Sequence, residues 1–127
     1  MSKVSQQTAA IQQDIGIGTV SRDQRDGYEF SFLSFREQGV LEPLLKGLPD
    51  DMCPCPHWGY VIAGTVNFRH TDGHTEQFNT GDAFYVEPGH TPVIEPGTDV
   101  VFISPEHQAA AVDAVIQANM VAMAGAQ

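Results

Sequence analysis

Short alternating or continuous apolar runs recur along this chain, a pattern that is typical of β-strands. The first clear example is residues 28–32, which Leu33 and Phe35 extend less regularly. Shorter apolar, aromatic and β-branched runs follow at residues 58–63, 65–70, 75–78, 83–86, 91–94 and 100–103. Turn signals separate them at Asp72-Gly73, residues 79–82, Pro88-Gly89 and Pro96-Gly97. Short strands between such turns predict an antiparallel sandwich or barrel rather than alternating strands and helices.

The two ends of the chain have different patterns. Residues 1–14 are polar and have no sustained period, which predicts a flexible arm or a strand that docks on a partner subunit. Near the other end, Ser104 suits a helix N-cap and Pro105 the first helical position. The chain therefore divides into an arm, a barrel over residues 15–104 and a helix over residues 105–127. An apolar stripe on this helix is expected to pack on the barrel exterior or on a second subunit, and it consists of Val112, Val115, Ile116, Met120 and Met123.

Length and charge limit the possible functions. A chain of 127 residues predicts one domain. Sixteen acidic residues against six basic ones give a net charge of −10, which argues against binding to nucleic acid or to an anionic membrane surface. Neither a membrane-spanning run nor the apolar core of a signal peptide is recognisable, so we expect a cytoplasmic protein with reduced thiols.

The densest concentration of chemistry lies in residues 47–64, which hold both cysteines and the only tryptophan. Cys53, Cys55 and His57 alternate with prolines. In an extended backbone, alternate residues point to the same face, so two thiols and an imidazole would lie together. These are the ligand types that zinc prefers, and the segment predicts a metal site.

The spacing of this segment resembles the first motif of the cupins, a family of small jelly-roll β-barrels. That motif is a glycine, five residues, a His-x-His pair, a short spacer, a glutamate, six residues and a second glycine. Here Gly47 is followed by five residues and then Cys53 and Cys55, while His57 is followed by six residues and then Gly64. Thiols thus replace the histidine pair, an imidazole replaces the glutamate, and the spacer is at least two residues short.

The second cupin motif, a glycine, five residues, Pro-x-Gly, two residues and a histidine, is also recognisable. Gly81 opens it, and Pro88-Gly89 supplies the turn one place late. Pro92 occupies the histidine position, but His90 lies two residues earlier, which preserves the face of the strand. The resemblance covers residues 28–104. It implies an all-β, cupin-like jelly-roll barrel with a C-terminal α-helix, and a homodimer, which is common in that family.

In cupins the motif residues usually hold a divalent metal inside the barrel, often iron or manganese. The candidate ligands here are Cys53, Cys55, His57 and His90, and two sulfurs with two nitrogens suit tetrahedral zinc. Four protein ligands would close the coordination sphere and favour a structural or sensing role. Counting backward from His57 places the pair at Asp51 and Cys53 instead, so both counts agree on Cys53.

Three functions remain open at this point. The first is a non-catalytic barrel that binds zinc or senses a small molecule. The second is a metal-dependent enzyme (a dioxygenase, isomerase or decarboxylase), which requires an open coordination position and a carboxylate or third imidazole at the metal. The third is a metal-free ligand-binding barrel whose cysteines and histidines only pack. Catalytic residues are not assigned, and the further candidates for a ligand or base are Asp51, Glu87 and Glu95.

Two other groups receive structural interpretations. His70 and His74 flank a turn and are expected to be solvated. Tyr60, Phe84 and Tyr85 are interpreted as core residues, with the barrel mouth as the alternative.

Overall fold

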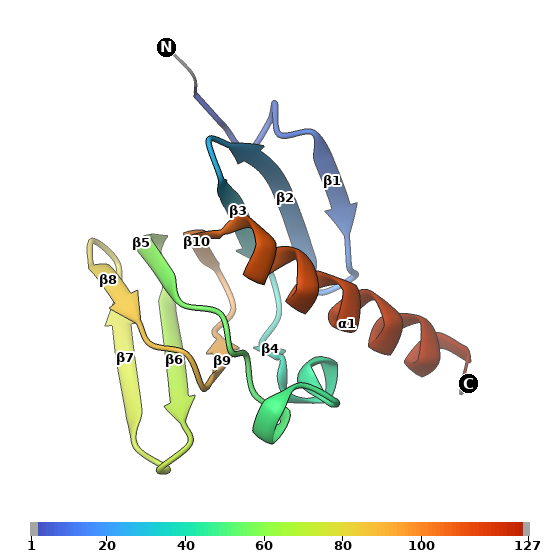
Figure 1. Cartoon of the computed structure of the whole chain (residues 1–127). Helices are drawn as coiled ribbons and strands as arrows, with labels where there is room; N and C mark the ends of the chain where they lie inside the picture. Colours follow the sequence, from blue (N-terminus) through green and yellow to red (C-terminus); the bar gives the residue numbers. More distant parts are fainter. Residues whose placement is uncertain (1–2, 126–127) are drawn as a thin grey trace.

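Two antiparallel β-sheets form the body of the protein in a computed structural model, which describes residues 3–125 (Figure 1). One sheet has the order β1 (Ile11–Asp14), β2 (Gly18–Arg25), β3 (Tyr28–Phe35), β10 (Thr98–Pro105), β5 (His57–Ala63) and β8 (Ala83–Val86). The other has the order β4 (Gly39–Val40), β9 (His90–Ile94), β6 (Thr65–His70) and β7 (Thr75–Asn79). Two 3₁₀ turns, η1 (Glu42–Leu45) and η2 (Pro49–Asp51), link β4 to β5, and the helix α1 (Glu106–Gly125) follows β10.

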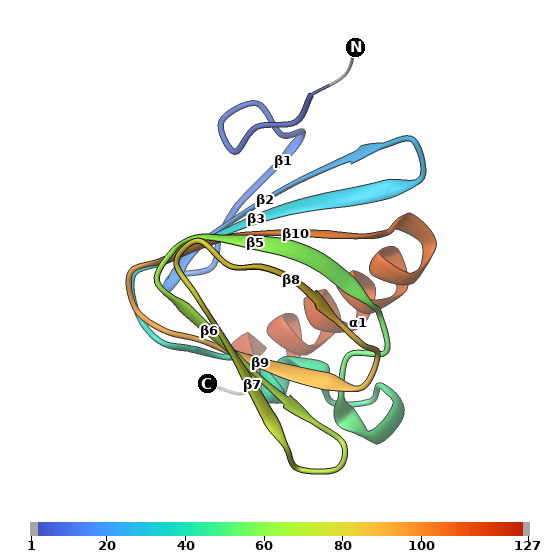
Figure 2. The ribbon, with the colours of Figure 1, turned by 90° about the vertical axis from the view of Figure 1, so that its left-hand side faces the viewer.

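The apolar core lies between the two sheets, which face each other in Figure 2. Strand β10 shows how the sequence produces it, because Val100 and Phe102 are buried while Val101 and Ile103 point outward and are half-buried. The same alternation in the other strands brings Phe68, Val61 and Ile94 into the core. The predicted all-β barrel with a C-terminal helix is confirmed.

Helix α1 covers the inner face of the six-stranded sheet at its β1–β2–β3 end (Figures 1 and 2). Three polar contacts attach the helix to β2, β1 and η1. Asp113 forms an ion pair with Arg22 at 2.9 Å. The side-chain amides of Gln117 and Gln13 are 3.1 Å apart, and the Asn119 amide donates to the carbonyl oxygen of Leu44 at 2.7 Å. The helix therefore packs on the inward-facing surface of the sheet, whereas the sequence predicted a position on the barrel exterior or on a second subunit.

The predicted start of the helix is also corrected. Ser104 and Pro105 are the last residues of β10, opposite Glu29 and Tyr28 of β3, and α1 begins at Glu106. The backbone N–H of Glu106 donates to the carbonyl oxygen of Gly27 at 2.9 Å, which holds this end of the chain against the β2–β3 turn. Ser104 is thus a strand residue with its side chain inside the barrel, not an N-cap.

The apolar stripe of the helix is only partly covered. Val112 is buried, Ile116 and Met120 are half-buried, and Met123 is 49% exposed. The residues predicted at the end of the helix lie outside the described residues beyond position 125.

The N-terminal stretch differs from the predicted arm. Residues 11–14 form β1, which pairs with β2 of the same chain from Ile11 opposite Arg22 to Asp14 opposite Thr19. Strand β2 was not predicted, because polar side chains occupy both of its faces and hide the alternation. The first two residues of the predicted arm lie outside the described part of the chain.

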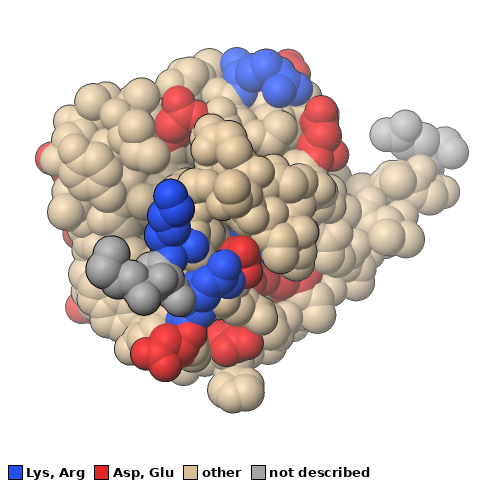
Figure 3. Space-filling model, turned by 90° about the horizontal axis from the view of Figure 1, so that it is seen from above, with Lys and Arg blue, Asp and Glu red and all other residues tan. Residues whose placement is uncertain are grey.

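The outer face of the six-stranded sheet is unusually apolar. Trp58, Tyr60 and Ile62 of β5 and Tyr85 of β8 are each 45–51% exposed on it. Phe84 is a core residue as predicted, whereas Tyr60 and Tyr85 lie outside the core. Viewed from above, much of the surface carries neither acidic nor basic side chains (Figure 3).

Across residues 3–125, no helix combines the length and the apolar character needed to span a membrane.

Candidate metal centre

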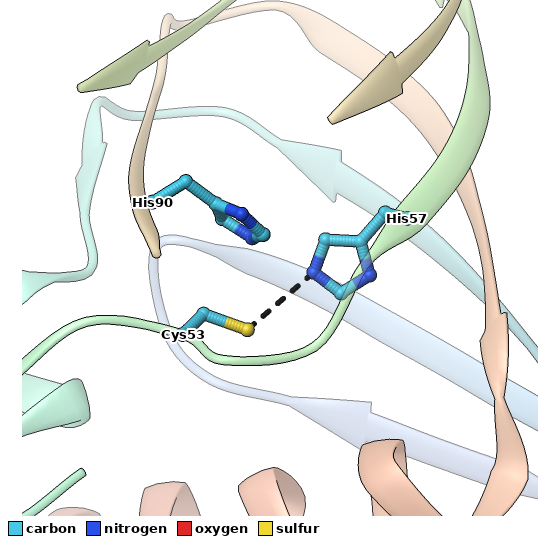
Figure 4. Close-up of side chains that lie close together, drawn as sticks. All are labelled: Cys53, His57 and His90. Atoms are coloured by element: carbon cyan, nitrogen blue, oxygen red, sulfur yellow. Dashed lines mark hydrogen bonds between the residues drawn. The ribbon is translucent and has the colours of Figure 1, made fainter. Parts of the chain in front are cut away.

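Three of the four predicted ligands meet inside the barrel. Ligand atoms of Cys53, His57 and His90 all lie within 4.8 Å of one another. They come from three segments: Cys53 from the loop after η2, His57 from the start of β5 and His90 from the start of β9 (Figure 4). The Cys53 sulfur is 3.6 Å from Nε2 of His57, and the two imidazole rings are 4.8 Å apart.

Backbone hydrogen bonds hold two of these residues together. The N–H of Cys53 donates to the carbonyl oxygen of His90 at 2.9 Å, and the N–H of Gly89 donates to the carbonyl oxygen of Cys53 at 2.8 Å. Gly89 adopts a φ of +87°, a conformation that favours glycine, and so turns the chain into this contact. The distance between the Cys53 and His90 backbones is therefore set by the fold.

Hydrogen bonds also orient both imidazoles. Nδ1 of His57 is 2.6 Å from the Ser104 hydroxyl, and Nδ1 of His90 donates to the carbonyl oxygen of Glu87 at 2.6 Å. The Nε2 atoms are left for the site, an arrangement that commonly fixes metal-binding histidines. Within residues 3–125, Nε2 of His90 is buried and has no hydrogen-bond partner. A buried nitrogen lone pair without a partner is costly, and a metal ion would satisfy it.

Burial sets the charge of each group. It lowers the pKa of His57 to about 3 and the pKa of His90 to about 4, so both imidazoles are neutral, as metal ligands must be. Burial raises the pKa of the Cys53 thiol to about 11. This thiol therefore keeps its proton in the absence of a cation, and binding of a divalent ion would release it.

Cys55 does not join the other three. Its sulfur lies 3.5 Å from the carbonyl oxygen of Pro56, and the side chain packs beneath α1 against Ala109 and Val112. The prediction assumed an extended backbone, but the chain bends at Cys55, so the two thiols do not face the same point. Burial raises the pKa of Cys55 to about 12, as expected for a packed thiol.

The carboxylate candidates also lie apart from the site. The Asp51 side chain accepts the Gly47 N–H at 2.9 Å, and Glu95 contacts the Gln38 amide. Glu87 is exposed and contributes only its backbone carbonyl.

A cavity of about 130 Å³ adjoins the three ligands and extends beneath α1. Most of its wall is apolar, with Leu33, Phe35, Phe102 and Val112 among the lining residues. The arrangement can hold a metal ion at the edge of an apolar chamber.

One polar group in this cavity was not predicted from the sequence. Glu29 is 5% exposed and lines the cavity with Arg22 and Asp113. Burial, and then the neighbouring Asp113 carboxylate, raise the pKa of Glu29 from 4.5 to about 8, so it holds a proton at neutral pH. One signal was available: Glu29 has the same parity as Leu33 and Phe35, and that set faces the core.

Comparisons with known proteins bear on the fold. Neither a protein-family model nor a curated protein matches the chain. Solved structures do match. The polyketide cyclase RemF from Streptomyces resistomycificus is 14% identical, with 83% of this chain and 79% of that chain covered and a TM-score of 0.57. An RmlC-like cupin from Shewanella frigidimarina is 18% identical, with 80% and 88% covered and a TM-score of 0.55.

A third structure is the S161A mutant of Bacillus subtilis oxalate decarboxylase OxdC, at 12% identity and a TM-score of 0.58. It is covered over only 28% of its length, against 80% of this chain. The chain has the cupin fold. Identities this low establish the fold alone.

A second set of metal-capable groups, His70, His74 and Glu76, lies at the β6–β7 hairpin. Nε2 of His70 is 2.6 Å from the Glu76 carboxylate, and His74 contacts the carboxylate of Asp72. His74 is exposed as predicted, but His70 is only 7% exposed, because it lies on the inward face of β6 opposite His90. Carboxylates already pair with these imidazoles.

Proposed function

We propose that this cupin binds one zinc ion through Cys53, His57 and His90 and presents it to a small molecule in the adjoining cavity, in the cytoplasm. The observation that supports this most directly is the buried Nε2 of His90, which lacks a partner among the described residues and lies within reach of two other ligand types. One thiolate and two imidazoles form a softer ligand set than iron or manganese usually receive in oxygen-rich sites, which favours zinc.

Three protein ligands leave a coordination position for another molecule. A zinc ion there would supply a Lewis acid that holds an anionic oxygen. The residues of the chain provide the surroundings: Ser104 and the Glu87 carbonyl fix the imidazoles, and α1 and apolar side chains of the sheet line the cavity. We therefore favour a binding or sensing role in which occupancy of the cavity depends on the metal.

A metal-dependent enzyme is the second candidate, and Glu29 favours it. Its carboxyl group keeps a proton at neutral pH and shares the cavity with the three ligands. A group of this kind suits proton transfer to a bound substrate, as in isomerases and decarboxylases. Zinc has no redox chemistry, so dioxygenase activity is the least suited to this ligand set.

The expected homodimer would use the outer face of the six-stranded sheet. Trp58, Tyr60, Ile62 and Tyr85 are exposed there, and Asp99 is the charged residue among the outward positions of β10, β5 and β8. Two copies that each carry a charge of −10 repel one another, so a contact face with a single charged residue suits self-association better than the acidic remainder of the surface.

Zinc content measures the proposed function directly. The purified chain is stripped, reconstituted with zinc, desalted and analysed for metal. Wild type should retain up to one zinc per chain, and Cys53→Ser should retain much less. His74→Ala is the matched control in the hairpin group and should retain as much as wild type. Equal retention by wild type and Cys53→Ser, or retention by neither, would leave the metal-free barrel as the better account.

A further inference from the structure

The cavity beneath α1 has a second polar end, away from the three metal ligands. Arg22 of β2, Glu29 of β3 and Asp113 of α1 meet there, and Ser31 donates its hydroxyl to Glu29 at 3.3 Å. The Arg22 and Asp113 side chains are only 12% and 25% exposed although they form an ion pair. Charged side chains are rarely this buried without a function or a compensating network.

The charges at this end nearly cancel. Arg22 is positive and its partner Asp113 is negative, while Glu29 holds its proton. An anionic group of a ligand would therefore lie beside the carboxyl groups of Glu29 and Asp113, and the only cation there, Arg22, already pairs with Asp113. A neutral oxygen atom fits better than an anionic one.

One donor at this end is unused. Nη1 of Arg22 contacts Asp113, but Nε of Arg22 is buried and lacks a hydrogen-bond partner within residues 3–125. Arg22 lines the cavity, so an oxygen atom of a bound molecule would satisfy this N–H. The cavity thus has an unpartnered donor at one end and an unpartnered imidazole nitrogen, on His90, at the other.

The strands set the separation of the two ends. Glu29 lies opposite Ser104 in the β3–β10 pair, and Ser104 hydrogen-bonds to His57 of β5. Glu29, Ser104 and His57 therefore form a row across three adjacent strands, which spans about 10 Å at the usual strand spacing. The volume of about 130 Å³ between apolar walls is close to that of protein cavities of about 150 Å³ that hold benzene.

We infer that this cavity binds an aryl-sized monoanion, with its anionic oxygen at the metal end and a neutral hydroxyl or carbonyl oxygen at Nε of Arg22. The metal end of this inference rests on the proposed function, whereas the Arg22 end does not. The apolar walls select against sugars and nucleotides, and the length of the row selects against ions as small as acetate.

Two probes that differ by one oxygen test the inference, benzoate and 4-hydroxybenzoate. Each is titrated calorimetrically into the zinc-loaded full chain. We expect 4-hydroxybenzoate to bind about tenfold more tightly than benzoate, because it satisfies the buried donor that benzoate leaves unpaired. Equal affinity for the two, or binding of neither by the zinc-loaded chain, overturns the inference while the proposed function stands.

Variants of Arg22 test whether this residue causes the difference in affinity between the two probes. Arg22→Lys keeps a positive charge beside Asp113 but lacks the Nε donor, and it should bind both probes with the affinity of benzoate. The double variant Arg22→Met/Asp113→Leu removes the ion pair as a unit, so no buried charge is left alone, and should behave in the same way. Arg36→Met is the control, because Arg36 contacts the Gly16 carbonyl outside the cavity, and it should keep the tenfold difference. Discrimination that survives in both Arg22 variants overturns the inference.

The Arg22 end can be tested without zinc. In the metal-free chain, phenol should bind more tightly than toluene, and Arg22→Lys should abolish the difference. A chain that takes up no zinc but shows this preference contradicts the proposed function and supports the Arg22 end. A chain that takes up zinc but lacks the preference supports the proposed function and contradicts the Arg22 end.

Discussion

The cavity and the β6–β7 hairpin both bring imidazoles and carboxyl groups together, but one is buried and the other is largely exposed. In the cavity, burial lowers the pKa of His57 and raises the pKa of Glu29, so the neutral forms prevail. At the hairpin, hydrogen bonds from His74 lower the pKa of the exposed Asp72, which favours the charged form. The difference in exposure to solvent therefore sets which protonation state each of these groups favours.

The difference also concerns unused bonding capacity. The hairpin imidazoles of His70 and His74 each contact a carboxylate, whereas His90 in the cavity has a buried nitrogen without a partner among the described residues. A ligand gains more binding free energy at a buried site whose polar atoms lack hydrogen-bond partners than at an exposed site whose polar atoms already have them. The proposed metal site is therefore the cavity and not the hairpin.

The largest expected effect is the loss of zinc affinity on replacement of His90, and His70, which lies opposite it in the sheet, provides the comparison. His90→Ala should weaken zinc binding at least about 100-fold, since it removes a ligand and not only an orienting group. His70→Ala, opposite His90 in the sheet, should leave the affinity nearly unchanged. Competition against a chelator of known affinity measures both. A larger loss in His70→Ala than in His90→Ala would transfer the metal site to the hairpin.

The next effect is a dependence of stability on pH that is caused by Glu29. Its pKa is raised on folding from 4.5 to about 8, so the folded state holds the proton more tightly than the unfolded state. This contribution is complete below about pH 4.5 and is lost as the pH rises through 8. Glu29→Gln removes it, and wild type should lose on the order of 1–3 kcal/mol relative to the variant between pH 5 and pH 8.

Urea unfolding of both proteins across that pH range measures the difference. Glu37→Gln is the control, because Glu37 is exposed and is not among the residues that line the cavity. Parallel stability curves for wild type and Glu29→Gln would show that the carboxyl group of Glu29 is ionised in the cavity.

A smaller effect is expected at the hydroxyl that orients His57. Ser104→Ala removes the 2.6 Å contact to Nδ1 of His57 and should weaken zinc binding about tenfold, the lower end of such losses. Ser34→Ala on the outward face of β3 is the control and should bind zinc as wild type does. Chelator competition gives both values, and an unchanged affinity in Ser104→Ala would mean that packing against Phe102 alone fixes the His57 ring.

The smallest effect should be the loss of the hairpin imidazole itself. His74 and Asp72 are both more than half exposed, and an ion pair of this kind contributes little. His74→Ala should change the free energy of unfolding by no more than about 0.5 kcal/mol. A substantially larger loss in urea unfolding would indicate that the stacked rings of His70 and His74 support the hairpin.

Motif spacing predicted the fold, and it predicted three side chains, Cys53, His57 and His90, that the structure brings together. Turn dipeptides placed β6 and β8 at their observed bounds, and strand parity from the cupin motif pointed to His90. Cys55 lies apart from this group because parity holds only within a strand, and the chain bends between Cys53 and His57.

The remaining errors share another cause. Glu29 and Arg22 resemble solvent-facing residues of a strand, and only the helix that packs over them turns that face into an interior. Ser104 resembles an N-cap because a serine before proline fits that role locally, yet pairing with β3 keeps it in the sheet. Local pattern describes one element at a time, whereas these positions depend on contacts between distant elements.

The backbone hydrogen bonds between Cys53 and His90 affect the heat-capacity change that is expected when the proposed metal binds. Two ligands are held by amide hydrogen bonds that exist without an ion, so zinc uptake need not be coupled to folding, as it is in zinc fingers. Binding should then bury little additional surface and show only a small change in heat capacity. The far-ultraviolet spectrum should be the same before and after zinc is added. Exchange of the ion would depend on rotation of side chains and on access past α1, without unfolding of the barrel.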